Sequence, residues 1–300
     1  MIKKEFYIFN SKSLGNYFFP NDLIKGKVNA LIVSPLHGRS VALPQKDNCW
    51  ITIKGGGWNY GGPQIYVSKK DDELIFGLYP LESAERELEV SRRLQIVSDR
   101  FPKVLYYKKI CSAPLPEKYF FLKDITFSNG KPVIPVLLYT QVKSPFRVAD
   151  ISYLTDEEKK NAVQECCKYW EIEEKVYSNY FIKQLAENVA IMHKNGFIND
   201  TLEYSNVTML SEIVDYEWVT APGLKLPDGT FGMEIEDERK EKELLYGVEV
   251  CLQLKALLRE EYNLFDIYRT FIASYARINP ELIEKSKQIQ KFLSKEDFII

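Results

Sequence analysis

Short runs of β-branched and aromatic residues, separated by Gly, Pro and Asn, dominate the first half of the chain. Runs of this length and composition predict β-strands. Between residues 81 and 99 the pattern changes, because apolar and small side chains recur every three or four positions, and this spacing predicts a helix. We expect strands at residues 28–34, 50–53, 64–68, 73–78, 104–110, 119–122 and 133–142.

Helical patterns dominate the second half. Thr155 is a predicted N-cap, because three acidic residues follow it and favour the first turn of a helix. An amphipathic helix is predicted at 179–194, and Gly196 is expected to end it. Later helices are expected at 236–260, 265–275 and 280–293.

The change of pattern divides the chain into two regions and predicts an α+β fold. Residues 1–145 are expected to form a β-rich lobe with one inserted helix. Residues 146–300 are expected to form a helical lobe that contains a short hairpin at 199–216.

Composition and charge narrow the classes of partner. The chain has 300 residues, of which 45% are hydrophobic and 27% charged, as is typical of a globular protein. Its formal net charge of −2 predicts no general attraction to nucleic acid or to an anionic membrane. Its five cysteines are irregularly spaced and form no CxxC pair, which favours free thiols and a cytoplasmic location.

Four residues along the chain suggest phosphate and metal chemistry. Lys54 ends the strand WITIK, and Glu87 is on the inward stripe of the predicted helix. Asn206 and Asp215 stand at the two ends of the hairpin, where an amide and a carboxylate can share one Mg²⁺ ion. Taken singly, each has an ordinary explanation, since such Lys and Glu residues are mostly exposed and Asn and Asp form turns. Their joint order along the chain favours the functional interpretation.

These motifs are similar to those of a known family. The segment from Ala186 to Trp218 resembles the catalytic region of protein kinase-like folds. More narrowly, the chain resembles the selenoprotein O family of adenylyltransferase pseudokinases. The similarity lies in short motifs at residues 53–57, 85–88, 147, 205–206 and 214–216.

The resemblance implies a protein kinase-like two-lobed fold and transfer of AMP from ATP, with Mg²⁺ or Mn²⁺, to a protein or small-molecule acceptor. Two residues would be catalytic: Glu87 would orient the lysine, and Asp200 would align the nucleophile. The metal would be bound by Asn206 and Asp215. The phosphate groups would be held by Lys54, Gly55, Gly56, Gly57 and Arg147.

Departures from the family pattern leave two alternatives open. Ser205 stands where the family has an aspartate, which favours a catalytically inactive pseudokinase that acts as a binding or scaffold module. A small-molecule phosphotransferase would place an aspartate at Thr201, whereas Asp200 lies one position earlier.

Overall fold

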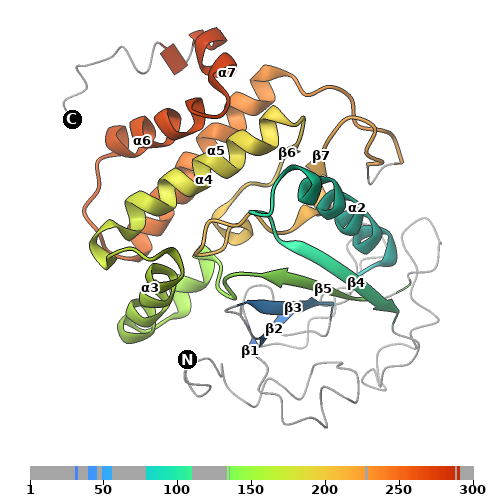
Figure 1. The fold of residues 1–300 in the computed structure, drawn as a ribbon, viewed down its shortest axis with the longest axis horizontal. Helices are drawn as coiled ribbons and strands as arrows, with labels where there is room; N and C mark the ends of the chain where they lie inside the picture. Colours follow the sequence, from blue (N-terminus) through green and yellow to red (C-terminus); the bar gives the residue numbers. More distant parts are fainter. Residues whose placement is uncertain are drawn as a thin grey trace, which may run out of the picture. The chain divides into compact units, whose positions relative to one another are not determined.

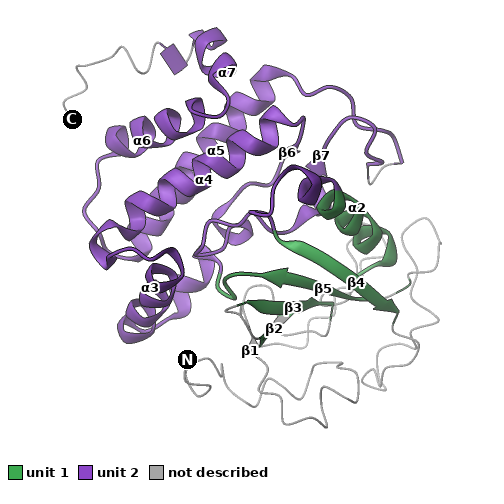
Figure 2. Cartoon of the chain, viewed as in Figure 1, with its two compact units in different colours: residues 1–92, 102–146 green, residues 93–101, 147–300 purple. Residues whose placement is uncertain are grey.

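The computed structural model describes residues 31–32, 40–45, 49–55, 79–109, 134, 136–226, 229–287 and 289–290. The chain divides into two compact units, shown in Figure 2. Unit 1 comprises residues 1–92 and 102–146, and unit 2 comprises residues 93–101 and 147–300. The fold is α+β. The strands predicted at 64–68, 73–78 and 119–122, and the glycines at 56 and 57, lie outside the described residues.

An antiparallel sheet forms the described part of unit 1 together with the start of one helix (Figure 1). The strand order is β1-β2-β3-β5-β4, so β3 is central, with β2 on one side and β5 on the other. At the end of β3, Lys54 pairs with Ser40 of β2 and with Leu138 of β5. The strands are β1 (Leu31–Ile32), β2 (Ser40–Pro44), β3 (Trp50–Lys54), β4 (Lys103–Lys109) and β5 (Val136–Val142).

Helix α2 (Leu81–Val97) buries one face at helical spacing. Ala84, Val90 and Leu94 supply the apolar part of that face, and Glu87 and Ser91 are buried within the same stripe. The Ser91 hydroxyl accepts a hydrogen bond from the Val104 amide at 2.8 Å and donates one to the Pro102 carbonyl at 3.2 Å. These bonds tie the helix to the start of β4.

Helices build most of unit 2. Thr155 caps α3 as the sequence predicts, through a reciprocal pair of hydrogen bonds with Glu158. Helices α4, α5 and α6 pack against one another, and Figure 1 shows them side by side. The helices are α3 (Asp156–Trp170), α4 (Tyr177–Lys194), α5 (Asp237–Leu257), α6 (Leu264–Ala276) and α7 (Pro280–Lys285).

Close packing joins α5 to α6. Gly247 of α5 lies so near Phe271 of α6 that an added Cβ would be 2.4 Å from Phe271 Cζ. The Phe271 ring is fully buried. A side chain at position 247 would require the buried Phe271 ring or the two helices to shift.

Short elements connect the helices of unit 2. Strands β6 (Ile198–Asn199) and β7 (Val219–Thr220) pair antiparallel. The helix predicted at 280–293 is interrupted, because α7 ends at Lys285 and Ser286 is extended, while residues 287, 289 and 290 are helical again. Residues 291–293 lie outside the described part of the chain. None of the helices in the described ranges is both long and apolar enough to cross a bilayer. The 3-10 turns are η3 (Val148–Tyr153), η4 (Glu174–Val176), η5 (Tyr204–Asn206) and η6 (Tyr216–Trp218).

Candidate functional site

A buried ion pair joins β3 to α2 in unit 1. Lys54 Nζ donates a hydrogen bond to Glu87 Oε1 at 2.8 Å, and the two residues are only 7% and 3% exposed. The Tyr79 hydroxyl donates to the same carboxylate oxygen, and the Lys54 ammonium lies 4.2 Å from the centroid of the Tyr79 ring. The structure thus brings together two residues that the sequence singled out and adds a third, Tyr79, that it did not.

The helix decides which glutamate meets the lysine. Glu82 and Glu85 of α2 are exposed, and Glu85 accepts a hydrogen bond from the Tyr107 hydroxyl at 3.1 Å. Glu87 is instead on the buried stripe. An ammonium group has three N–H donors, and one of those of Lys54 is engaged by Glu87.

Gly55 follows the lysine and has a backbone that other residues rarely adopt. Its φ is +95°, and a Cβ built there would lie 2.4 Å from the Val136 carbonyl oxygen and 2.8 Å from Tyr79 Cβ. Close packing against β5 and Tyr79 therefore accounts for this glycine. The neighbouring glycines at 56 and 57 lie outside the described residues.

In unit 2, a hairpin brings Asn206 and Asp215 near each other. The Val214 amide donates to the Asn206 carbonyl at 2.9 Å, so Asp215 directly follows the residue paired with Asn206. A bridge between Val207 and Ile213 continues the hairpin. Arg147 joins the same structure, because it forms an antiparallel bridge with Thr208.

Hydrogen bonds fix the orientation of the Asn206 amide. Its Nδ2 donates to the Thr201 carbonyl at 2.9 Å, so the nitrogen end faces an acceptor and the oxygen end is on the other side. Arg147 Nη1 approaches that oxygen at 3.4 Å and donates a shorter bond, 2.7 Å, to the Ser205 carbonyl. Arg147 and Asn206 thus form one connected group.

The backbone of Asp215 is left-handed, with φ 64° and ψ 71°. Among the described residues, three other non-glycine residues share a positive φ. Two of these, Glu171 and Arg259, follow the ends of helices, and Ser211 is in the tight turn of the hairpin. Asp215 instead precedes η6, where an extended residue is usual. Aspartate is among the few non-glycine residues that adopt this region routinely.

Asp200 is held by groups that the sequence analysis did not anticipate. Arg239 Nη2 donates to both carboxylate oxygens at 2.7 Å, and Thr220 Oγ1 donates to Oδ2 at 3.0 Å. The side chain of Asp200 is 40% exposed. The carboxylate is therefore fixed in place while it remains accessible to solvent.

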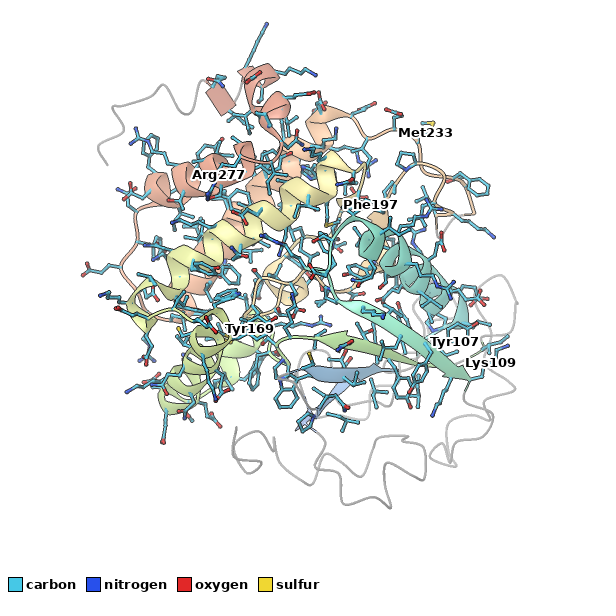
Figure 3. All side chains as sticks on the ribbon, viewed as in Figure 1. Tyr107, Lys109, Tyr169, Phe197, Met233 and Arg277 are labelled. Carbon is cyan, nitrogen blue, oxygen red and sulfur yellow. The ribbon has the colours of Figure 1, made fainter. Side chains whose placement is uncertain are left out.

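A buried network supports the loop that begins at β6. His193 Nε2 lies 2.8 Å from Glu243 Oε2, and His193 Nδ1 lies 2.9 Å from the Tyr275 hydroxyl. Glu243 Oε1 accepts a hydrogen bond from the Asn199 amide at 2.9 Å. Burial raises the pKa of the Glu243 carboxyl above its ordinary value. Phe197, labelled in Figure 3, is buried just before β6.

Most of the residues that sequence reasoning missed in unit 2 come from later helices, and Thr220 comes from β7. Glu243 and Arg239 belong to α5, and Tyr275 belongs to α6. His193 is in the last turn of α4, and its burial between Glu243 and Tyr275 indicates a structural role.

Metal ligation in the described ranges depends on few protein groups. No group of three or more His, Cys, Asp or Glu residues gathers there. A cation at the hairpin would rely on the oxygens of Asn206 and Asp215. No protein-family model and no curated protein matches this chain.

Proposed function

We propose that this chain is an ATP- and Mg²⁺-dependent transferase of protein kinase-like fold, which transfers AMP to an acceptor. The observation that carries the proposal is the buried Lys54–Glu87 ion pair. Removing two charges from water is costly, and apolar residues of similar volume often replace such a pair without loss of stability. A function that needs a fixed cation explains why the pair is present.

Two cations are available for the phosphate groups. The Lys54 ammonium is oriented by Glu87 and by the ring of Tyr79. The Arg147 guanidinium is oriented by the Ser205 carbonyl and by Asn206. Cations held in fixed positions stabilise transferring phosphate groups without a cost of reorganisation during the reaction.

The hairpin residues fit a Mg²⁺ ion by chemistry. Mg²⁺ prefers oxygen ligands and keeps several waters, so one amide oxygen, one carboxylate and the substrate phosphates are enough. Asn206 Oδ1 has two lone pairs, and the 3.4 Å contact with Arg147 engages at most one of them. Asp215 supplies the carboxylate. The ion would neutralise phosphate charge, and these two side chains would fix its position.

Asp200 would align the acceptor group. Its carboxylate is held by Arg239 and Thr220, and carboxylate oxygens offer about four lone-pair sites in all. A site is therefore left for a hydrogen bond from an acceptor hydroxyl or amine. Asp200 would then orient the attacking group and accept its proton as that group bonds to the α-phosphorus of ATP and pyrophosphate leaves.

A second candidate function is a catalytically inactive pseudokinase that binds or scaffolds a partner. The observation that favours it is Ser205, which stands where the resembling family has an aspartate and whose hydroxyl donates to Glu203. A serine supplies no negative charge at that position. A small-molecule phosphotransferase is a third candidate, and the same experiment separates all three.

The test uses the full chain with ATP labelled at either the α- or the γ-phosphate, in Mg²⁺ or Mn²⁺. We expect label from the α-phosphate, and none from the γ-phosphate, on the chain itself or on added acceptors. Asp215→Asn should lower the transfer rate by about 100-fold or more, because it removes charge stabilisation of the transition state. Asp266→Asn, an exposed carboxylate on α6, is the matched control and should transfer at the wild-type rate.

Each other outcome selects a different function. Transfer of the γ-label identifies a phosphotransferase. Binding of ATP without transfer of either label identifies the pseudokinase. A chain that neither binds ATP nor transfers label refutes the proposal.

A further inference from the structure

We propose that a cavity between the 200–204 loop and α5 binds an organic cation that carries an ammonium or guanidinium group. The cavity has a volume of about 360 Å³. That volume is within the range of small-molecule sites in proteins. It lies entirely within unit 2, where α5 packs against β6 and η5.

Negative charge lines this cavity. Asp200, Glu203 and Glu249 contribute three carboxylates, and no lysine or arginine is among the lining residues. Two cations lie close by: Arg239 binds Asp200, and Lys242 Nζ is 5.7 Å from the centroid of the Tyr246 ring. The carboxylates outnumber these cations, so the cavity keeps an excess of negative charge that would repel an anion.

Two aromatic rings also line the cavity. Tyr204 and Tyr246 are half-buried and line it from the loop and from α5. The faces of such rings attract ammonium and guanidinium groups, and carboxylates form charge-assisted hydrogen bonds with the same groups. An uncharged apolar ligand would instead desolvate the carboxylates without pairing them. Gln253 adds an amide that can meet a polar group of the ligand.

The assignment of this cation as the acceptor rests on the proposed function. Asp200 lines the cavity and is also the residue proposed to align the attacking group. An amine or hydroxyl on a bound cation would then lie in the same cavity as that carboxylate. The binding itself does not depend on the transfer reaction and can be measured without ATP.

The experiment is titration calorimetry of the full chain with spermidine and, separately, with a short lysine-containing peptide. The two probes share the ammonium group and distinguish a free amine from a side chain of a polypeptide. We expect one-to-one binding that weakens as ionic strength rises. The paired variant Glu203→Gln/Glu249→Gln should weaken binding by about tenfold or more, because it removes two of the three carboxylate charges that line the cavity.

The controls separate this site from general attraction to an acidic surface. Glu238→Gln removes an exposed carboxylate from the same helix, outside the cavity, and should bind both probes like the wild type. Equal binding by the paired variant, or equal binding of an uncharged diol of similar length, would overturn the inference. AMP transfer without cation binding refutes this site alone, and cation binding without any transfer refutes the proposed function alone.

Discussion

Glu87 is the point at which two donors of unit 1 meet. The Lys54 ammonium and the Tyr79 hydroxyl both donate to its Oε1, and all three residues are buried. Removing one member of such a pair leaves the other as an uncompensated buried charge, whereas removing both charges does not. Stability and nucleotide binding should therefore respond differently to single and paired substitutions.

Lys54→Met alone should lower the free energy of unfolding by about 3–5 kcal/mol, because it leaves the Glu87 carboxylate buried without its cation. Lys54→Met/Glu87→Gln should recover most of that loss, since the neutral amide still accepts from Tyr79. Both variants should bind ATP more weakly than the wild type. Urea unfolding and titration calorimetry measure the two effects.

Glu82→Gln, at an exposed position on the same helix, is the control and should change the free energy of unfolding by less than about 0.5 kcal/mol. Equal stability of the single and paired variants would show that the ion pair is not the source of the effect.

Local pattern predicts some contacts and misses others for a physical reason. The end of a strand and the inward stripe of a helix are visible in short windows, so the sequence singles out Lys54 and Glu87, which the structure pairs. The α5 partners of Asp200 and His193, Arg239 and Glu243, are 39 and 50 residues away along the chain. Nothing near Arg239 or Glu243 in the sequence indicates these contacts.

At the scale of elements, strong periodicity was the reliable guide. The helices expected near 81–99, 179–194, 236–260 and 265–275 are present, with ends shifted by a few residues. Strand β2, with the sequence SVALP, was missed, because alanine and proline are poor strand formers. It is a strand because β1 and β3 pair with it on both sides.

Two glycines with positive φ should differ sharply in their tolerance of a side chain. Gly55→Ala must displace the Val136 carbonyl, so we expect a loss of more than about 2 kcal/mol in the free energy of unfolding. Gly196 ends α4 with φ +74°, and its nearest neighbour, Pro222 Cδ, is 3.5 Å from a built Cβ. Gly196→Ala should therefore cost only about 1 kcal/mol. Similar losses in urea unfolding would contradict this account of Gly55.

At the scale of the whole molecule, the residues named in the proposed function belong to both units. Unit 1 contains Lys54 and Glu87, and unit 2 contains Arg147, Asn206 and Asp215. The division into a strand-rich and a helical part followed from the change in hydrophobic period. The pairing of residues across long sequence separations did not, since periodicity reports only which face of an element is buried.

If both units serve one nucleotide, substitutions in the two should not act independently. Lys54→Met and Asp215→Asn should each weaken binding of ATP with Mg²⁺, and the paired variant should lose less than their sum by about 0.5 kcal/mol or more. Chelation of Mg²⁺ should abolish the effect of the single variant Asp215→Asn on ATP binding. Lys54→Met with Asp266→Asn is the matched pair and should be additive. Strict additivity in both pairs would indicate separate ligands.

Helix α5 contributes residues to the loop contacts, to the cavity and to the packing against α6. Arg239 and Glu243 hold the loop at Asp200 and Asn199, Tyr246 walls the cavity, and Gly247 meets Phe271. A bulkier residue at 247 would displace Phe271 or move α5 away from α6. A movement of α5 would also move Arg239 and Glu243, which contact the loop. A smaller side chain at position 271 would loosen the same contact between α5 and α6 from the α6 side. Substitutions at Gly247 or Phe271, inside the helical bundle, would therefore change the position of the loop without changing its sequence.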